Sequence, residues 1–311
     1  MKIALIGSGM MAEEHVKTYL DICNVKLLGI FSRSQGKAID LAIKYKIPNV
    51  YLSIESLYKS THADLVIIAV SELSVNEVCK EAFKYPWQVL IEKPVGYNLQ
   101  DAEDIAEAAD KAGRKAYVAL NRRHYSSTRA VLTEIEDVAG QRLVQVLDQE
   151  NPLVALEGGQ PQLVIDNWMY ANSIHIIDYL CVFCRGEVTS VDHVIKWDPQ
   201  EPRFVMSKVN YSSGDIGVYQ AIWNGPGPWS VSVSTQAKRW EMRPLEQAAS
   251  QIYKSRKNEP LPVHEWDTKF KPGLRMQAEE TIKALRGEKH SLPTLADGIN
   301  TMKLVSKIYQ T

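Results

Sequence analysis

Short apolar runs alternate with amphipathic stretches of helical length over the first 121 residues. The runs are KIALIG, VKLLGIF, DLVIIAV, QVLIEK and KAYVALN. They are continuous in Val, Ile and Leu, as strands buried on both faces of a parallel sheet require. The stretches between them, at about 11–22, 35–45, 73–84 and 99–113, have the length and polarity of helices. The pattern predicts a doubly wound α/β domain with a parallel sheet.

After Asn121 the pattern predicts a different domain. We expect a helix at about 125–137, the strand RLVQVLDQE and a helix near 173–184. The strand-like segments EVTSVDHVIKW, RFVMSKVNYS, DIGVYQAIW, WSVSVSTQ and RWEMRPL follow, and turns such as SSGD and NGPGP favour antiparallel pairing. DIGVYQAIW is apolar on both faces, so helices on one side and another subunit on the other would cover it. Two amphipathic helices, about 273–287 and 294–309, close the chain.

The 311-residue length suits two domains. We expect a Rossmann domain that binds a dinucleotide at 1–121. A second α/β domain at 122–311, with a large, mainly antiparallel open sheet, would bind the substrate and form the homo-oligomer. Its C-terminal helix would be able to pack back on the first domain.

Composition narrows the partners. The chain is 45% hydrophobic and 23% charged with a net charge of -1, and its basic residues form no stripe. This excludes a nucleic-acid footprint and a polybasic membrane anchor, and we find no transmembrane run. Four cysteines are few for the length and suit a reducing compartment, so we expect a cytoplasmic protein with a small-molecule partner.

Cys181 and Cys184 form a CxxC motif inside the apolar run IHIIDYLCVFC. A structural zinc site would need further ligands, and the sequence offers no second cysteine pair. We therefore interpret both cysteines as core residues and expect no metal.

The first turn carries a dinucleotide-binding motif. Gly7-Ser8-Gly9-Met10-Met11-Ala12 reads G-x-G-x-x-A, follows the strand KIALI and opens a helix. Gly7 allows the tight turn, Gly9 lets backbone amides approach a pyrophosphate, and Ala12 lets the helix lie close to the strand. The helix N-terminus then attracts the phosphates. The alternative is a tight turn without a ligand.

The end of the second strand bears on the choice of nucleotide. An acidic residue there would bind the ribose 2′-hydroxyl of NAD, but the chain has Phe31-Ser32-Arg33-Ser34. Arg33 can pair with the 2′-phosphate of NADP, and the two serines can donate hydrogen bonds to it. NADP is therefore favoured over NAD; dual specificity and a merely solvated arginine are the alternatives.

Further motifs follow in a fixed order. Glu92-Lys93-Pro94 ends the strand QVLIEK, Asn121-Arg122-Arg123 comes at the end of the run KAYVALN, and a His-x-x-Asp helix lies in the second domain. In this order they resemble the Gfo/Idh/MocA oxidoreductases over nearly the whole chain. The resemblance implies an NAD(P)-dependent dehydrogenase or reductase that acts on the CH-OH group of a sugar, nucleotide sugar or polyol.

Lys93 matches the family's lysine, which contacts the substrate hydroxyl and the nicotinamide. An ammonium group beside a cationic nicotinamide is disfavoured, so Lys93 should lose its proton readily and help a hydroxyl lose its own. A strand-end lysine in solvent is the structural alternative.

His175 matches the family's helix-borne histidine. With Asn172 or Ser173 as N-cap it would lie in the first helical turn, where the helix dipole favours a neutral imidazole that accepts a proton. Asp178 could orient the ring, cap a neighbour or face the domain interface. A histidine packed in the core is the alternative.

The chain departs from the family pattern at Ala171. Many members carry an aspartate at this position, four residues before the histidine. Several polar residues could substitute for it, and sequence does not choose among Asp166, Asn167, Tyr170, Asn172 and Tyr125. Trp168 and Tyr170 could form an apolar wall for a sugar face, although core packing is the more common role of such aromatics.

Together these motifs define the expected site. Lys93 and His175 are the expected catalytic residues. The expected cofactor contacts lie at the strand ends of the first domain: Gly7, Ser8, Gly9, Met10, Met11, Ser32, Arg33, Ser34, Val70, Ser71, Glu92, Lys93 and Asn121. The expected substrate contacts are Lys93, Tyr125, Asn167, Trp168, Tyr170, Asn172 and His175. A noncatalytic NADP-binding regulator and a reductase of double bonds or imines are the alternative functions.

Overall fold

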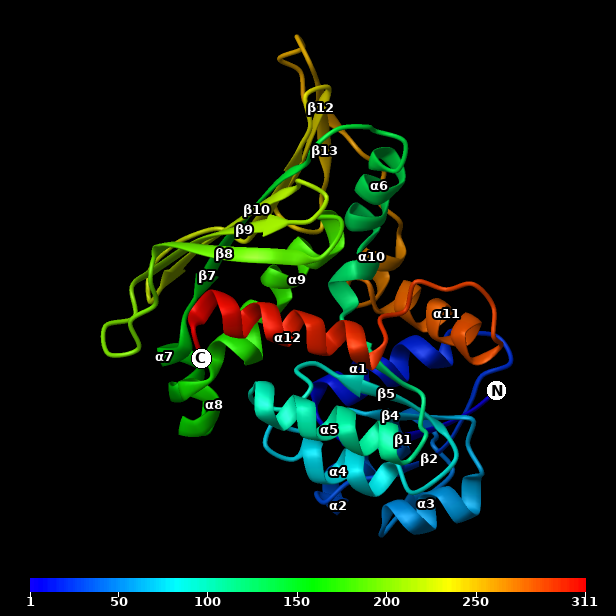
Figure 1. The fold of residues 1–311 in the computed structure, drawn as a ribbon. Coiled ribbons are helices and arrows are strands. Elements are labelled where there is room, and N and C mark those ends of the chain that lie inside the picture. The colour runs from blue at the N-terminus through cyan, green and yellow to red at the C-terminus, as the bar shows by residue number, and fades with distance from the viewer. The chain divides into compact units, whose positions relative to one another are not determined.

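The computed structural model describes all 311 residues, which form two compact units. The first unit comprises Met1–Asn121 and Thr268–Asn300, and the second comprises Arg122–Asp267 and Thr301–Thr311. Figure 1 labels the elements of both units along the chain. No helix combines the length and apolar character needed to cross a membrane.

A parallel sheet of six strands forms the centre of the first unit, in the order β3-β2-β1-β4-β5-β6. The strands are β1 (Lys2–Ile6), β2 (Lys26–Phe31), β3 (Val50–Tyr51), β4 (Leu65–Ile68), β5 (Gln88–Glu92) and β6 (Ala116–Ala119). This doubly wound order confirms the predicted class. It reverses between β1 and β4, and ligands of such folds bind beyond the carboxyl ends of the strands at that point.

Helices flank this sheet. They are α1 (Met10–Leu20), α2 (Gln35–Tyr45), α3 (Ile54–Thr61), α4 (Val75–Ala82), α5 (Leu99–Lys111) and α11 (Leu274–Leu285). Helix α1 buries the side chains of Ala12, His15, Val16 and Tyr19, whose spacing places them on one helical face. The four helices predicted between strands are confirmed. β3 and α3 were not predicted. A two-residue strand such as β3 has no apolar run to mark it.

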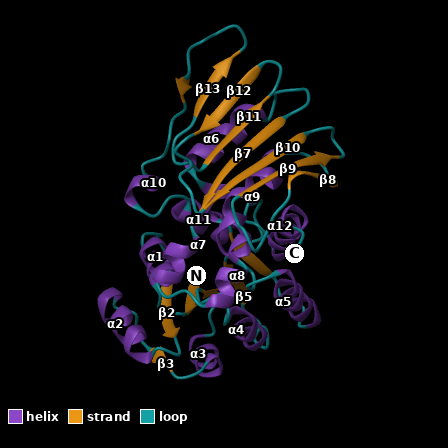
Figure 2. Cartoon of the chain, turned by 90° about the vertical axis from the view of Figure 1, so that its left-hand side faces the viewer, coloured by secondary structure: helices purple, strands orange, loops and turns teal.

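The second unit contains an eight-stranded mixed sheet, in the order β14-β13-β12-β11-β7-β10-β9-β8 (Figure 2). Its strands are β7 (Leu143–Glu150), β8 (Val188–Ile195), β9 (Phe204–Tyr211), β10 (Ile216–Trp223), β11 (Ser230–Ser234), β12 (Lys238–Met242), β13 (Ala249–Ile252) and β14 (Glu259–Pro260). β7 and β10 are parallel, and the other pairs are antiparallel. The predicted large, mainly antiparallel sheet is confirmed.

One predicted hairpin is wrong. The turn SSGD joins β9 and β10 as an antiparallel pair, but NGPGP does not pair β10 with β11 because β7 lies between them. The NGPGP loop instead closes over the end of β7. Asn224 donates its backbone N–H to the carbonyl of Glu150, and Trp229 Nε1 donates to the carbonyl of Gln149. The turn residues were recognised correctly, but their partner strand was not.

Helices α6 and α9 lie on one side of the second sheet (Figure 1). The helical segments of this part of the chain are η1 (Asn121–His124), α6 (Ser126–Ile135), α7 (Pro152–Glu157), α8 (Gln162–Asp166), the π-helix η2 (Met169–Ser173), α9 (Ile174–Phe183), α10 (Trp266–Lys269) and α12 (Leu295–Tyr309). Buried and more exposed positions alternate along β9 and β10. The helix-covered face is therefore the core of the unit, and the opposite face is open.

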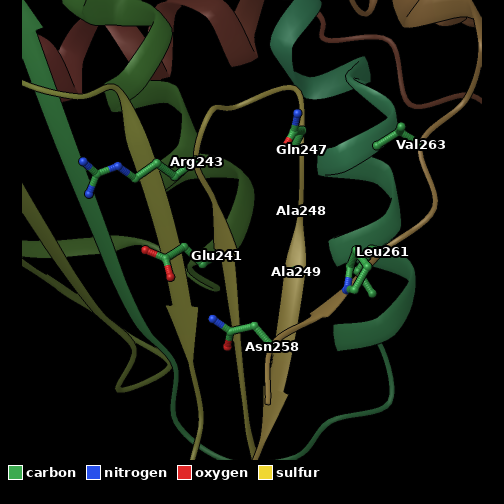
Figure 3. A pocket seen from close by; sticks show the side chains of 9 residues that line it. Glu241, Arg243, Gln247, Ala248, Ala249, Asn258, Leu261 and Val263 are labelled. Atoms are coloured by element: carbon green, nitrogen blue, oxygen red, sulfur yellow. The ribbon is translucent and has the colours of Figure 1, made fainter. Parts of the chain in front are cut away.

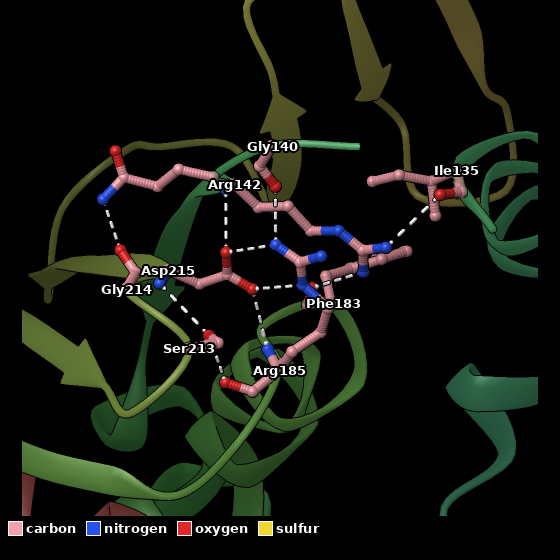
Figure 4. A network of polar contacts seen from close by, with 9 residues as sticks. Ile135, Gly140, Arg142, Phe183, Arg185, Ser213, Gly214 and Asp215 are labelled. Atoms are coloured by element: carbon pink, nitrogen blue, oxygen red, sulfur yellow. Dashed lines mark hydrogen bonds and ion pairs between the residues drawn. The ribbon is translucent and has the colours of Figure 1, made fainter. Parts of the chain in front are cut away.

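A buried carboxylate joins three segments of the second unit (Figure 4). Asp215 accepts hydrogen bonds from the backbone N–H groups of Arg142 and Arg185 and from the Arg185 guanidinium. Burial alone would raise the pKa of Asp215, but these donors outweigh it and lower the pKa to about 2. Asp215 therefore ties the start of β7 to the end of α9 and the turn before β10.

The CxxC cysteines lie at the end of α9. Cys184 is buried and Cys181 is half-buried. Burial raises the pKa of the Cys184 thiol, which disfavours the thiolate that metal binding and redox chemistry use. These surroundings favour the packing role expected from the sequence.

Candidate functional site

The turn after β1 brings two backbone segments of the first unit into close contact. Gly7 has a φ of +114°, and a Cβ built on it would lie 2.0 Å from the carbonyl oxygen of Ala69. Its N–H donates to the carbonyl of Phe31 at 2.8 Å. Only glycine fits this position, because an L side chain would collide with the loop after β4. Gly7 therefore makes the tight turn that the sequence motif predicted.

Gly9 begins α1 and has a different environment. A Cβ on Gly9 would meet no protein atom within 4 Å, so the space beside it is open. No side chain caps the first turn of α1. The backbone N–H groups of that turn are therefore available to an anionic ligand, which suits the pyrophosphate of a dinucleotide.

Serines and one arginine connect the loops after β1, β2 and β4. Ser8 Oγ donates to Ser32 Oγ at 2.9 Å, and Arg33 donates to Ser74 Oγ. Ser71 and Ser74 are hydrogen-bonded at 2.9 Å through their hydroxyl groups. The structure thus brings together four residues predicted from three different loops. Ser74 is a member that the sequence reasoning missed.

Lys93 directly follows β5, and a buried hydrogen bond fixes the residue before it. His15 Nε2 and Glu92 Oε1 are 2.6 Å apart, and both side chains are almost fully buried. The Glu92 carboxylate is thus engaged by α1 within the protein. Lys93 is half-buried, and the peptide bond that joins it to Pro94 is cis.

The remaining predicted cofactor residues occupy the same edge of the first sheet. Val70 and Ser71 follow β4, and Met10 and Met11 form the first turn of α1. Asn121 follows β6, is buried and donates its Nδ2–H to the carbonyl of Pro272 at 3.0 Å. The cofactor-binding residues predicted from the sequence therefore lie at the carboxyl ends of adjacent parallel strands.

In the second unit, His175 is the second residue of α9 and is half-buried. The π-helix η2 precedes α9 without a break, and Ser173 has helical backbone angles. The expectation of a free helix start at Asn172 or Ser173 is therefore wrong. The helix-dipole argument for a neutral His175 loses its basis with it, because that effect is confined to the first turn. A π-helix itself is a frequent feature of functional sites.

Trp168 and Asn172 are held by one acidic side chain. Trp168 Nε1 donates to Glu150 Oε2 at 2.6 Å, and Asn172 Nδ2 donates to the same oxygen at 2.8 Å. Glu150 ends β7 and is fully buried. The structure thus brings together two predicted substrate residues through a residue that was not predicted.

The other predicted substrate residues lie elsewhere in the second unit. Tyr170 is only 1% exposed, and its hydroxyl contacts Thr311 Oγ1 at 2.9 Å, so it is a core aromatic. Tyr125 is buried just before α6, and burial raises the pKa of its hydroxyl. Asn167 donates to the carbonyl of Leu163 at an exposed edge.

The carboxylate of Asp178 is held by two neighbouring side chains. Arg123 donates two hydrogen bonds to its carboxylate, at 2.8 and 2.7 Å, and Thr301 Oγ1 donates a third at 2.7 Å. Of the roles left open for Asp178, these contacts favour tying α9 to neighbouring segments over orienting the ring of His175.

Two missed residues left a signal in the sequence. His15 lies three residues after Ala12 and four before Tyr19, so helical spacing places it on the sheet-facing side of α1. Glu150 continues the alternation that points Val144 and Val146 inward on β7. A polar residue at a predicted core position was the mark of both.

A separate cavity of about 510 Å³ lies at the β12–β14 end of the second sheet (Figure 3). Polar and charged side chains from the strands and their loops line it, among them Glu241, Arg243, Gln247 and Asn258. None of the residues selected from the sequence borders this cavity, so it is distinct from the candidate site.

Comparison with known proteins agrees with the Rossmann fold of the first unit. Residues 1–120 match the model of the Gfo/Idh/MocA oxidoreductase family, which is described by its NAD-binding Rossmann fold. A 4-carboxy-2-hydroxymuconate-6-semialdehyde dehydrogenase of Sphingobium sp. is 21% identical, over 99% of this chain and 98% of the relative.

Two solved structures share the fold across both units. UDP-N-acetylglucosamine 3-dehydrogenase from Acidithiobacillus ferrooxidans has a TM-score of 0.80 at 14% identity, covering 100% of this chain and 97% of its own. A levoglucosan dehydrogenase, solved with NADH and levoglucosan, has a TM-score of 0.82 at 15% identity, covering 100% and 96%. At these identities the likeness establishes the fold.

The two glycines of the first turn should respond differently to the same substitution. Gly7→Ala should lower the free energy of unfolding by about 3 kcal/mol, because it combines an unfavourable φ with a steric collision. Gly9→Ala should cost about 1 kcal/mol or less, since the space is open and alanine is only a poorer N-cap. Urea unfolding of both variants measures the difference. Equal losses would contradict the structural distinction between the two positions.

Proposed function

Because the chain belongs to the Gfo/Idh/MocA oxidoreductase family through residues 1–120, we propose a specific reaction for it. It transfers hydride between a nicotinamide dinucleotide and a hydroxyl or keto carbon of a sugar, nucleotide sugar or polyol. The observation that carries the proposal lies in the first unit. The uncapped first turn of α1 beside Gly9 and the Lys93 strand end share the carboxyl edge of one parallel sheet.

Each part of the site has a distinct task in this reaction. When bound, the nicotinamide supplies or takes up the hydride. The N–H groups at the start of α1 bind the pyrophosphate, and Glu92, held by His15, fixes the backbone next to Lys93. Lys93 and His175 handle the proton of the substrate hydroxyl as general base and acid.

The substrate class is supported by the names of similar proteins. They include dehydrogenases of levoglucosan, of UDP-N-acetylglucosamine and of scyllo-inositol. Trp168 suits a sugar substrate because an indole can pack against a sugar face, and Asn172 adds an amide that can bind hydroxyl groups.

We propose NADP as the preferred cofactor and NAD as the alternative. Arg33 is exposed and its side chain donates to Ser74, so it can exchange that bond for one to a 2′-phosphate. Ser32 and Ser34 flank it, and no carboxylate follows β2 to bind a free 2′-hydroxyl.

The roles of the two domains and the cellular location complete the proposal. We propose that residues 1–121 bind the cofactor. Residues 122–311, of which 268–300 belong to the first compact unit, bind the substrate and form the oligomer in this proposal. The small number of cysteines supports a cytoplasmic enzyme.

We also propose a homo-oligomer formed through the open face of the second sheet. Phe204 is 53% exposed, and a shallow cavity of about 250 Å³ beside it is lined by apolar side chains that include Leu147, Ile195 and Ile222. A contiguous apolar surface of this kind is typical of protein interfaces. A second copy of this chain is the proposed occupant, since two copies of one apolar sheet face can bury each other.

Turnover with NADPH and a panel of keto-sugars tests the reaction. The wild type should oxidise NADPH, and Lys93→Met should lower kcat/KM by a factor of about 10²–10⁴, because the proton-transferring amine is lost. Lys111→Met, at an exposed lysine of α5, is the control and should match the wild type. Cofactor binding without turnover of any substrate would instead favour a noncatalytic regulator. Product analysis with labelled hydride would reveal reduction of a double bond or imine.

Cofactor choice is tested by Arg33→Ala. The variant should bind NADPH about tenfold or more weakly and NADH unchanged, because a charge-assisted bond to the 2′-phosphate is lost. Lys44→Ala, which removes a cation from the last turn of α2, is the control. Calorimetry measures the affinities of the wild type and of both variants for NADPH and for NADH. Equal weakening for both cofactors would refute the assignment of Arg33 to the 2′-phosphate.

The oligomer is tested by placing a charge on the open face. Phe204→Glu should dissociate the assembly, because the new carboxylate would be buried at the interface. Ile252→Glu is the matched control: Ile252 is 60% exposed, but the alternation along β13 assigns it to the opposite face of the sheet. Light scattering gives the mass of each. A monomeric wild type at micromolar concentration, or an unaffected Phe204→Glu variant, would argue against this interface.

A further inference from the structure

Two carboxylic side chains point into the interior of the second unit from β7. Asp148 and Glu150 are 2% and 0% exposed, on the face of β7 that Val144 and Val146 also occupy. The two residues are two positions apart on one strand, so their side chains are neighbours on the same face of the sheet. Their hydrogen-bond partners are neutral groups. Two adjacent carboxylates without a direct counter-ion are costly in a protein interior.

The oxygens of this pair indicate where a proton belongs. With both groups ionised, Asp148 Oδ1 and Glu150 Oε1 are buried acceptors without a donor. A single proton satisfies both atoms, because one carboxyl then donates to the other. Burial raises the pKa of Asp148, and burial together with the charge of Asp148 raises the pKa of Glu150 well above its ordinary value. The two groups therefore titrate as one pair.

Hydrogen bonds extend from the pair to both ends of the π-helix η2. Glu150 accepts from Trp168, which immediately precedes η2, and from Asn172 within it. On the other side, the Tyr219 hydroxyl donates to Asp148 Oδ2 at 2.6 Å and contacts the Tyr309 hydroxyl at 2.7 Å. The Tyr309 hydroxyl in turn contacts Ser173 Oγ, the last residue of η2, at 3.3 Å. The polar network thus brackets Ala171, where the family's aspartate is missing.

The other titratable groups around the pair come from four elements. β10 contributes Tyr219 and α12 contributes Tyr309, and burial near Asp148 raises the pKa of both hydroxyls well above 10. η1 contributes Arg122, whose charge favours the ionised form of Asp148. α9, which packs on β7, carries His175 and Asp178, and Asp178 is paired with Arg123.

We propose that the Asp148–Glu150 pair shares one proton and, from the strand β7, fixes the side chains of Trp168 and Asn172 for the substrate. Asp148 and Glu150 are positioning residues in this scheme. The positioning role rests on the proposed function, whereas the shared proton does not.

Infrared spectroscopy tests the shared proton directly. The wild type at neutral pH should show a protonated-carboxyl C=O band that is absent from Glu150→Gln. The glutamine keeps the shape of the side chain and can donate to Asp148, so the variant should fold. Identical spectra in this region would overturn the shared proton.

The pH dependence of stability gives an independent measurement. Glu150 binds its proton more tightly in the folded than in the unfolded chain, where the ordinary pKa is 4.5. Its contribution to folding is complete below that value and is lost as pH rises through the raised folded pKa. The free energy of unfolding of the wild type should therefore decline over this range, and Glu150→Gln should remove that part of the decline. Parallel pH profiles of the two proteins would overturn the proposal.

Positioning is tested by a removal and its conservative rescue. Glu150→Ala should raise KM about tenfold with a smaller effect on kcat, and Glu150→Gln should restore KM. Glu134→Ala is the matched control. Glu134 lies on α6, and its Oε2 accepts a comparable hydrogen bond from the indole Nε1 of Trp240 at 2.7 Å. A purely structural role predicts either no effect or a loss that glutamine does not rescue, and both results would overturn positioning.

The indole N–H resonance of Trp168, assigned with Trp168→Phe, provides a readout that needs no turnover. It should shift in Glu150→Ala and stay close to the wild type in Glu150→Gln, while the Trp240 resonance stays fixed in both. If Glu150→Ala does not fold, Asp148→Ala replaces it, since it removes the proton-sharing partner. An unmoved Trp168 signal would overturn positioning. Failure to find any turnover would contradict only the proposed function.

Discussion

The contact between the backbones at Gly7 and Ala69 is the constraint on which the first unit's site depends. Any Cβ at Gly7 would stand 2.0 Å from the carbonyl oxygen of Ala69, so the loops after β1 and β4 meet only because that atom is absent. This contact lies where the strand order reverses. It places the start of α1 beside the loop after β4, and it lets the Ser8–Ser32 and Arg33–Ser74 bonds connect three loops. The candidate cofactor site therefore depends on the close approach between Gly7 and Ala69.

Buried acids hold residues of the candidate site in each unit. In the first, the carboxylate of Glu92 is held by His15, so the residue before Lys93 cannot rotate freely. In the second, Glu150 holds the side chains on either side of Ala171. In both cases the acid is buried and the residue of the candidate site lies beside it. A buried hydrogen bond to a charged or strongly polar group restricts motion more than an exposed one, because water cannot replace it.

The sequence predicted elements whose physical cause is local. Parallel strands require continuous apolar runs, and the Gly7 and Gly9 turn requires two glycines at fixed spacing, so both could be recognised. The pairing of β7 with β10 and β11 could not, because NGPGP is an ordinary turn sequence and only the tertiary fold places β7 between its flanking strands. The π-helix has no sequence period of its own. Its place before α9 made the helix start expected at Asn172 or Ser173 wrong.

The strand pattern did carry information about the candidate site that was not used. Alternation along β7 predicts that Asp148 and Glu150 face the core with Val146, and a core-facing acid demands partners. Those partners turned out to be Tyr219, Trp168 and Asn172.

This pair also gives a physical reason for alanine at position 171. With one shared proton, as proposed, the pair leaves one negative charge beside the segment between Trp168 and Ser173. A further carboxylate on η2 would add a second charge to the same buried surroundings, at a cost that only another cation or another proton could offset. An uncharged residue at position 171 avoids that cost.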